Sequence, residues 1–191
     1  HGLSVDAARF YIDCRNQQLT VFPPGTTTGR MMTNAGRTRS MGVELAATWK
    51  PVDDLTLRAS YGYTNATFRK YNDGRNDYRG KRVPYAPSNT LFGEVNWRIT
   101  PLRFMEVTPS LNVSARCVGN IYWNEANTVS QPFYCLPSVS VAFDAPHWSL
   151  RLWADNFTAT RYNTFYFVSI GNTFVQRGLP RLLGATVRVR I

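Results

Sequence analysis

Apolar and polar side chains alternate with a period of two along most of this chain. Eight segments carry the pattern, and none sustains the 3.6-residue period of a helix. They are Leu3–Phe22, Met41–Lys50, Leu55–Phe68, Leu91–Thr100, Phe104–Cys117, Leu136–Phe143, Trp148–Thr158 and Leu183–Ile191. A strand with this pattern has one apolar and one polar face. The sequence therefore predicts an all-β fold of eight antiparallel strands.

The connections between these segments alternate between short and long. The short ones are Pro51–Asp54, the region of Pro101, and Ala145–His147, whereas the long polar ones are about 23–39, 69–89, 119–134 and 161–180. A soluble sandwich gives no reason for this alternation, but outer-membrane barrels have short periplasmic turns and longer outside loops. The pattern thus favours an antiparallel transmembrane β-barrel.

Aromatic residues support the same interpretation. Each of four rings adjoins a short turn and shares the apolar face of its strand: Trp49, Trp97, Phe143 and Trp148. Tyr61 and Tyr63 lie at the other end of their strand. Amphipathic rings at both ends of an apolar stripe are typical of the two aromatic girdles of a membrane barrel. We expect the apolar faces to contact lipid and the polar faces to line the lumen.

Composition adds two limits. Hydrophobic residues make up 43% and aromatic residues 14% of the 191 residues, which excludes a typical disordered chain and favours β-structure. The sequence has no run of about 18 apolar residues, so no membrane-spanning helix is predicted. A mean hydropathy of -0.29 remains compatible with strands that alternate.

The formal net charge is +10. This surplus would attract an anionic partner such as phosphorylated lipid or an acidic ligand, or it would reflect lumen and loop arginines without a specific partner. Because the basic residues are scattered singly and no binding motif frames them, nucleic acid is not expected as a partner.

The sequence offers little for catalysis or metal binding. Cys14, Cys117 and Cys135 match no zinc spacing, and His1 and His147 are too few and too far apart for a metal cluster. No nucleophile, base and acid set is visible. We therefore expect no catalytic residues, no metal and no cofactor, and a protein that is not an enzyme.

Six local patterns occur in the order typical of the C-terminal part of TonB-dependent outer-membrane receptors. The most specific is an Asn and a Gly leading into a strand that carries Gly42-Val43-Glu44. The six are Arg9–Leu19, Asn34–Leu45, Ser60-Tyr61 within Leu55–Thr64, Gly80–Pro87, Asn156 followed by Tyr162, and Gly178–Arg181. The chain resembles this family over nearly its whole length. It departs from the family at its end, where Ile191 stands in place of the usual Phe.

The resemblance implies that residues 1–191 form the C-terminal third of a 22-stranded barrel, without the plug domain. It implies a receptor in the outer membrane of a Gram-negative bacterium that takes up a scarce, bulky nutrient, usually a ferric siderophore and sometimes haem, cobalamin or a glycan. The partners would be the TonB complex through the missing plug, outer-membrane lipid and lipopolysaccharide, the small-molecule nutrient and a surface lipoprotein. A chain that opens within a strand also fits an excised piece.

Two other functions stay open. A complete eight-stranded barrel with a structural, adhesin-like or channel role fits the strand count and length. A soluble β-sandwich that serves as a binding module requires the apolar stripes to face each other.

Two groups of residues are candidates for function or stability. Ligand contacts are expected from the long loops, because guanidinium groups suit anionic oxygens and aromatic faces suit planar ligands. These candidates are Tyr71, Arg75, Tyr78, Arg79, Tyr122 and Trp123. The loop charges would otherwise meet lipopolysaccharide phosphates or water. A Cys117–Cys135 disulfide is expected across one outside loop, with Cys14 free, unless all three cysteines are buried thiols.

Overall fold

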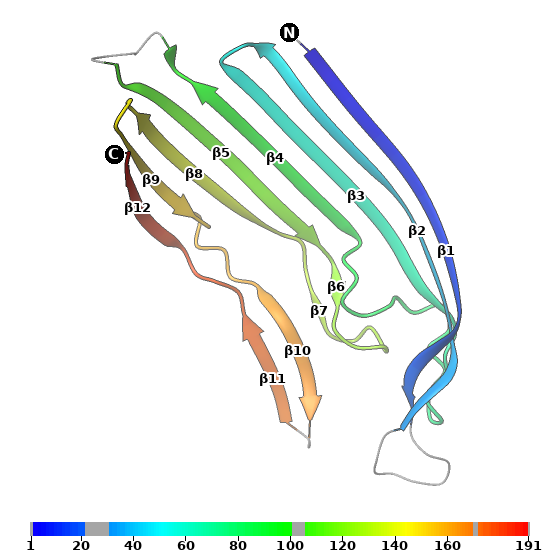
Figure 1. Ribbon diagram of the computed structural model, residues 1–191. Coiled ribbons are helices and arrows are strands. Elements are labelled where there is room, and N and C mark those ends of the chain that lie inside the picture. Colours follow the sequence, from blue (N-terminus) through cyan, green and yellow to red (C-terminus); the bar gives the residue numbers. More distant parts are fainter. Residues whose placement is uncertain (1, 22–30, 101–105, 170–171, 191) are drawn as a thin grey trace.

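The computed structural model describes residues 2–21, 31–100, 106–169 and 172–190, and it contains one large antiparallel sheet (Figure 1). Eight strands follow one another in the order β1-β2-β3-β4-β5-β8-β9-β12. Their bounds are β1 Gly2–Val21, β2 Met31–Val52, β3 Leu55–Lys70, β4 Asn89–Arg98, β5 Thr108–Gly119, β8 Tyr134–Asp144, β9 Trp148–Asp155 and β12 Leu182–Val189. The prediction of eight antiparallel strands is confirmed.

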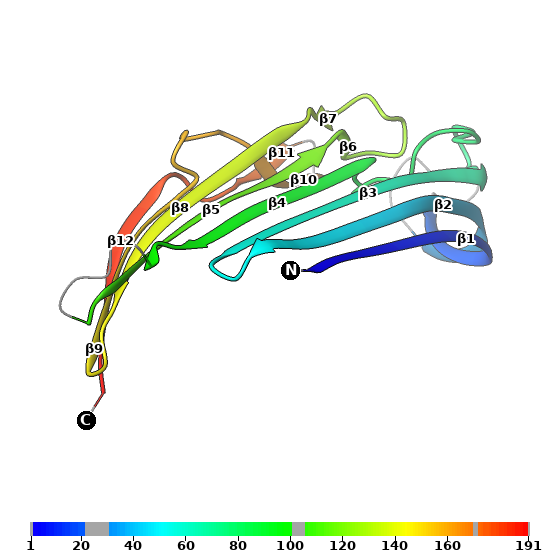
Figure 2. The same cartoon turned by 90° about the horizontal axis from the view of Figure 1, so that it is seen from above.

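The sheet is curved and open. Figure 2 shows it as an arc seen from above. The first and last of its strands, β1 and β12, form the two edges of the sheet and do not pair with each other in the described ranges. A complete eight-stranded barrel would close these edges, so that alternative is not supported. Within the ranges given above, no helix is long and apolar enough to span a membrane.

The register brings the apolar positions of all strands onto one face. Leu45 lies opposite Tyr61, and Tyr61 lies opposite Leu91. The pairs Val95–Val113, Val113–Val139 and Val141–Leu152 continue the face across the sheet without a register shift. These side chains remain open, with Leu45 48% and Leu152 47% exposed. The face therefore packs against no second sheet, and the β-sandwich alternative is wrong.

Three of the four aromatic residues expected at the turn end, Trp49, Trp97 and Trp148, form a row beside the short turns on that face. Trp49 is opposite Leu57, and Leu55, two residues earlier in β3, is opposite Trp97. Trp49, Trp97 and Trp148 are 49%, 44% and 41% exposed. The row has the place and the exposure that a girdle requires.

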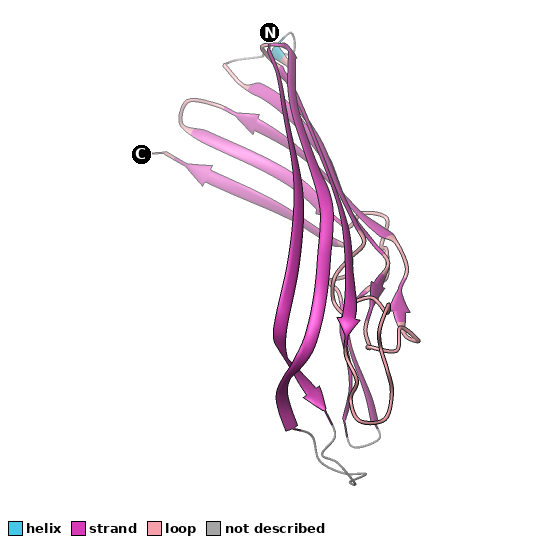
Figure 3. Ribbon diagram, turned by 90° about the vertical axis from the view of Figure 1, so that its right-hand side faces the viewer, coloured by secondary structure: helices cyan, strands magenta, loops and turns pink. Residues whose placement is uncertain are grey.

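Long loops gather at the opposite end of the sheet, away from both chain ends (Figure 3). Two of them contain hairpins that the sequence pattern did not predict. β6 (Ile121–Tyr122) pairs with β7 (Ser130–Gln131), and β10 (Asn163–Ser169) pairs with β11 (Asn172–Arg177). The connection 161–180 is thus a hairpin rather than an irregular loop.

Several strand bounds differ from those expected. β2 begins at Met31 rather than Met41, and it remains paired with β1 as far as Val21–Met31. Residues 31–40 lack apolar alternation, so this part of β2 depends on backbone pairing with β1 rather than on an apolar face. β9 ends at Asp155 rather than Thr158, because Asn156 turns the chain with a φ of 47°. β5 begins at Thr108, and the expected start at Phe104 lies outside the described residues.

Two of the motifs that carried the resemblance meet in space between β9 and β12. Asn156 donates from Nδ2 to the Leu179 carbonyl (3.3 Å), and the Gly178 amide donates to the Tyr162 carbonyl (2.9 Å). A Cβ on Gly178 would lie 2.0 Å from the Tyr162 ring, so only glycine fits beneath that ring. The two motifs together close the last long connection of the sheet.

Candidate functional site

The loop between β3 and β4 folds back onto the loop end of β3. The Phe68 amide donates to the Lys81 carbonyl (2.9 Å), and the Val83 amide donates to the Ala66 carbonyl (3.0 Å). Phe68 shares the polar face of β3 with Arg58, because the pairing of β3 with β2 is regular between these residues. Residues 81–83 therefore run beside β3, with Arg82 bridged to Thr67, and the packing around Phe68 places part of the loop over the polar face.

An apolar cluster stabilises this loop. Phe68 is 2% and Tyr71 is 4% exposed, and Tyr78 and Val83 pack against them. The ring centroids of Phe68 and Tyr71 are 4.9 Å apart, and those of Tyr71 and Tyr78 are 5.1 Å apart. Tyr71 and Tyr78 were expected to contact ligand, but burial against their own loop makes Tyr71 a packing residue.

A carboxylate organises the tip of the same loop. Asp73 Oδ1 accepts from the backbone amides of Arg75 (2.9 Å) and Asn76 (2.7 Å), and Asp73 Oδ2 accepts from the Tyr78 hydroxyl (2.9 Å). Burial raises the pKa of Asp73, but these hydrogen bonds outweigh it and hold the pKa below its usual value. Burial, and then the bond to Asp73, raises the pKa of Tyr78 to about 12.

The two arginines expected to contact ligand lie at the exposed tip of this loop. Arg75 is exposed, and its amide is held by Asp73. Arg79 Nη2 lies 3.2 Å from Asp77 Oδ2, and the two side chains are 73% and 47% exposed. An exposed pair of this kind contributes at most about 1 kcal/mol to stability. Both guanidinium groups therefore remain accessible to an anionic group outside.

A second loop, which carries β6 and β7, is hydrogen-bonded to the first through Asn127 and Tyr122. Asn127 accepts the Arg82 amide at Oδ1 (2.7 Å) and donates from Nδ2 to the Arg82 carbonyl (3.0 Å). Tyr122 accepts the Tyr85 amide at its backbone carbonyl (2.9 Å). Trp123 is 5% exposed, so it packs between loops rather than offering a ring face, and Tyr122 is half-buried.

Aromatic rings from two loops form an exposed row that sequence reasoning missed. Tyr85 packs edge-on against Trp123 (5.3 Å between centroids) and stacks on Phe165 (5.4 Å). The row continues through Phe167 to Phe174, whose rings stack at 4.9 Å. We call Tyr85, Phe165, Phe167 and Phe174 the loop aromatic row. All four are 42–47% exposed.

Part of this row was visible in the sequence as the three consecutive aromatic residues Phe165, Tyr166 and Phe167. It was hard to recognise, because Tyr166 and Val168 make the run continuously apolar. The chain also holds Tyr85 at a φ of 63°, which is uncommon for a residue other than glycine. Its hydroxyl donates to the Tyr166 carbonyl and so joins the first loop to β10.

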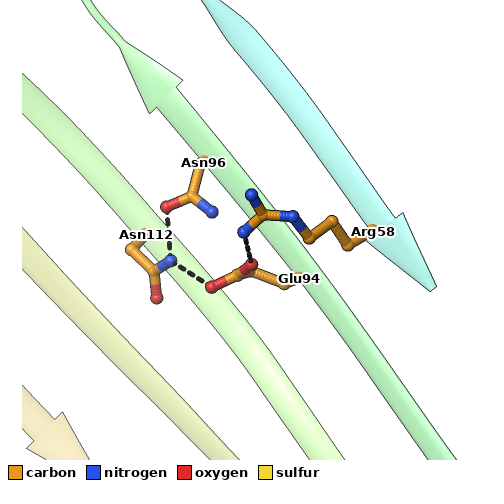
Figure 4. Close-up of polar contacts among 4 residues, drawn as sticks. All are labelled: Arg58, Glu94, Asn96 and Asn112. Carbon is orange, nitrogen blue, oxygen red and sulfur yellow. Dashed lines mark hydrogen bonds and ion pairs between the residues drawn. The ribbon is translucent and has the colours of Figure 1, made fainter. Parts of the chain in front are cut away.

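The polar face of the sheet carries a hydrogen-bonded network away from the loops (Figure 4). Arg58 Nη1 donates to Glu94 Oε2 (2.8 Å), and Asn112 Nδ2 donates to Glu94 Oε1 (2.9 Å) and to Asn96 Oδ1 (2.6 Å). A shallow polar recess of about 500 Å³ adjoins it, with Ser138, Arg151 and others along its wall. Within the part of the chain that the structure describes, no three His, Cys, Asp or Glu residues are grouped to hold a metal ion.

The predicted pair of cysteines meets at the boundary between the sheet and the second loop. Cys117 and Cys135 are opposite each other in β5 and β8 and are bonded, with Cα atoms 4.0 Å apart. Cys14 is free and exposed.

A curved antiparallel sheet with one open apolar face, one polar face and loops at a single end is a segment of the wall of a membrane β-barrel. The family model "TonB dependent receptor-like, beta-barrel" matches residues 1–157. The chain belongs to the TonB-dependent receptor family, as the resemblance implied.

Two relatives in this family are similar to the chain in sequence. The chain is 27% identical over 188 residues to the pesticin receptor of Yersinia enterocolitica, which covers 98% of this chain and 27% of the relative. It is 33% identical over 122 residues to the ferrioxamine receptor of Yersinia enterocolitica, covering 62% of this chain and 15% of the relative. The chain thus spans about a quarter or less of the length of these relatives.

Solved structures share the fold. The crystal structure of the ferric yersiniabactin uptake receptor FyuA from Yersinia pestis matches 98% of this chain and 27% of its own, with a TM-score of 0.82 and 24% identity. The ferric citrate transporter FecA in the unliganded form matches 97% of this chain and 29% of its own, with a TM-score of 0.72 and 23% identity.

Proposed function

We propose that this chain is part of an outer-membrane receptor of a Gram-negative bacterium that takes up a ferric siderophore by energy-coupled transport. The observation that carries the proposal is the family match over residues 1–157, together with relatives named as a pesticin receptor and a ferrioxamine receptor. The chemistry is recognition and passage rather than catalysis. Haem, cobalamin and a glycan are the other nutrient classes to test.

In this proposal residues 1–191 are one barrel segment, the C-terminal third of a 22-stranded wall. The two open edges of the sheet support it, because the backbone amides and carbonyls along β1 and β12 need neighbouring strands inside a bilayer. The polar face with Arg58, Glu94 and Asn112 would face a plug domain, and the plug would contact the TonB complex. Outer-membrane lipid would cover the apolar face, and a surface lipoprotein is a further partner to test.

Within that receptor, the outer loops of this segment would contribute to ligand capture. Arg75 and Arg79 supply exposed guanidinium groups for anionic oxygens, and the loop aromatic row supplies flat apolar faces. The unusual backbone of Tyr85 supports a functional role for its ring, because such conformations gather at ligand-binding positions. Tyr71 and Trp123 would act indirectly by fixing the loops.

The test is uptake by cells that make the whole receptor. A strain without its own siderophore receptors is given the full-length gene and a panel of radioactive ferric siderophores, ferric citrate and haem. We expect iron uptake from at least one ferric siderophore, and we expect it to stop when TonB is deleted. Uptake that persists without TonB, or no uptake from any siderophore despite normal insertion of the receptor, would contradict the proposal.

A further inference from the structure

Three arginines lie together on the apolar face of the β1–β2 hairpin, on the loop side of the apolar positions Met41, Val43 and Leu45. Arg15 is directly opposite Arg37, and Arg39 is one pleat below, opposite Asp13. Pairing is regular from these residues down to Leu3–Trp49, so all three arginines share the face of Leu45 and Trp49. We call Arg15, Arg37 and Arg39 the outward arginine cluster. It faces away from the polar side of the sheet.

The height of the cluster is set by strand geometry. Arg39 lies ten positions before Trp49 in β2. At about 3.3 Å per residue and a tilt of about 40°, ten residues rise about 25 Å, which is the height of the apolar band of a membrane barrel. Trp49 is at the turn end, so the cluster lies at the opposite border of the band, on the loop side. That border is the headgroup level of the outer leaflet.

Neighbouring groups hold two of the arginines in place. Arg37 donates from Nε to Asp13 Oδ1 (2.9 Å), and its side chain is still 41% exposed. The Arg39 guanidinium lies 5.5 Å from the centroid of the Tyr11 ring, and its Nε is a buried donor with no acceptor among the described residues. Arg15 is exposed. Three cations and one carboxylate leave two positive charges without a counter-charge within the cluster.

Arginines on the lipid-facing side destabilise the inserted barrel, and a phosphorylated lipid headgroup beside them would remove this destabilisation. An arginine on the lipid face is destabilising unless it reaches the interface, where it meets water or anionic groups. Arg9 lies below the cluster, opposite Val43, and its long side chain points to the same face. A guanidinium group forms two parallel hydrogen bonds to a phosphate, and several guanidinium groups suit a doubly phosphorylated ligand.

We propose that the outward arginine cluster binds the phosphate groups of lipid A, the membrane anchor of lipopolysaccharide. The inference rests on the proposed outer-membrane location, and it adds a lipid site on the opposite face from the candidate nutrient site. Tyr11 packs beneath the guanidinium of Arg39, and Asp13 fixes the guanidinium of Arg37. The free donors of the two groups and Arg15 then complete the phosphate site.

The experiment measures lipid A binding to the full-length receptor in neutral detergent by native mass spectrometry. The variant carries Arg15→Gln, Arg37→Gln and Arg39→Gln. Its matched control carries Arg98→Gln, Arg116→Gln and Arg151→Gln, which remove the same charge from the polar face. We expect the first variant to bind bisphosphorylated lipid A about tenfold or more weakly, because charged hydrogen bonds are lost, and the control to bind it as the parent does.

A panel of anionic ligands distinguishes a specific lipid A site from non-specific attraction of anions to positive charge. Lipid A without phosphates, phosphatidylglycerol and inorganic phosphate are tested beside bisphosphorylated lipid A. Equal binding of phosphatidylglycerol, displacement by inorganic phosphate at matched concentration, or equal loss in both triple variants would overturn the proposal. The single variant Arg15→Gln leaves the Asp13–Arg37 pair intact, and it should still lower binding if the triple variant fails to fold. Iron uptake is measured separately, so a receptor that binds lipid A without transporting iron would contradict only the transport proposal.

Discussion

Cys117 faces Cys135 directly across β5 and β8, and the bond between them closes the loop that carries β6 and β7. The two residues are 18 positions apart in the chain. The bond lies at the border between the sheet and its outer loops, close to Tyr134, whose ring stacks on Tyr162 at 4.7 Å. One covalent link thus anchors the base of the second loop.

Removal of this link should destabilise the barrel. The double variant Cys117→Ser with Cys135→Ser should lower the free energy of unfolding by about 2–4 kcal/mol, because the unfolded chain regains the freedom of a closed loop. Urea unfolding of the receptor in lipid vesicles measures the effect. Cys14→Ser is the control and should change nothing. Alkylation without reductant, read by peptide mass spectrometry, should modify Cys14 and leave Cys117 and Cys135 unmodified, and modification of all three would show that the bond is absent.

The open apolar face should tolerate no charge near its middle. Val95→Arg or Leu152→Arg should cost about 2–4 kcal/mol of folding free energy in a bilayer, because the guanidinium would lie in hydrocarbon. Ser114→Arg is the control, since Ser114 lies on the polar face next to Val113. Folding into vesicles, followed by heat-modifiable migration on gels, measures the difference. If all three variants insert equally well, the apolar face does not contact lipid.

The bond between Tyr78 and Asp73 makes the first loop sensitive to alkaline pH. Because the pKa of Tyr78 is raised to about 12 from an ordinary value of 10, the folded loop holds the phenolic proton more tightly than the unfolded loop. Its contribution to stability is complete below pH 10 and is lost as the pH rises from 10 towards 12. Absorbance at 295 nm, compared between the parent and Tyr78→Phe, should isolate one late-titrating tyrosine. Asp73→Ala should move this titration to lower pH, and an unchanged titration would show that the bond is absent.

Within the β10–β11 hairpin, only the face that carries the loop aromatic row should contribute to ligand affinity. Phe167→Ala with Phe174→Ala should weaken binding of the transported ferric siderophore about tenfold, because stacking faces are lost. Val168→Ala with Val175→Ala is a matched control, since these residues are on the same strands and are 50% and 48% exposed. Fluorescence quenching on the purified receptor measures affinity. Equal affinity in the parent and both variants would remove the row from the capture surface.

A second binding prediction concerns the exposed loop cations. Arg75→Gln with Arg79→Gln should weaken an anionic ferric siderophore more at low salt than at high salt, because exposed charges are screened. Tyr122→Ala with Trp123→Ala should also weaken binding, but through displaced loops, since Trp123 is buried. Hydrogen exchange at residues 82–88 separates the two causes: it should rise in the Tyr122 and Trp123 variant and stay constant in the arginine variant.

The strands of the sheet were largely predictable, because a strand with one apolar and one polar face alternates apolar and polar side chains with a period of two. Val95 and Glu94 differ in character for that reason alone, and the face of each followed from its position in the chain. The same rule failed at residues 31–40, where an unpatterned sequence around Asn34 and Gly36 extends the strand by pairing with β1.

The candidate site was predicted less well, because loop residues obey no such period. Arg75 and Arg79 lie at an exposed loop tip, and their role as ligand contacts stays a prediction. Tyr71 has no sequence feature that distinguishes a ring packed on Phe68 from a ring offered to a ligand. The loop aromatic row depends on contacts between residues as far apart as Tyr85 and Phe165. Such contacts are set by the tertiary fold and not by local sequence.

The hydrogen bonds between Arg82 and Asn127, with Tyr85 packed between Trp123 and Phe165, have a consequence for recognition of the proposed receptor from outside the cell. Three segments that are distant in the sequence together form one conformational epitope. An antibody or bacteriophage protein that binds this surface would contact all three segments at once. A linear peptide copied from any single loop would lack the other two segments, and it would be a poor immunogen for the native receptor.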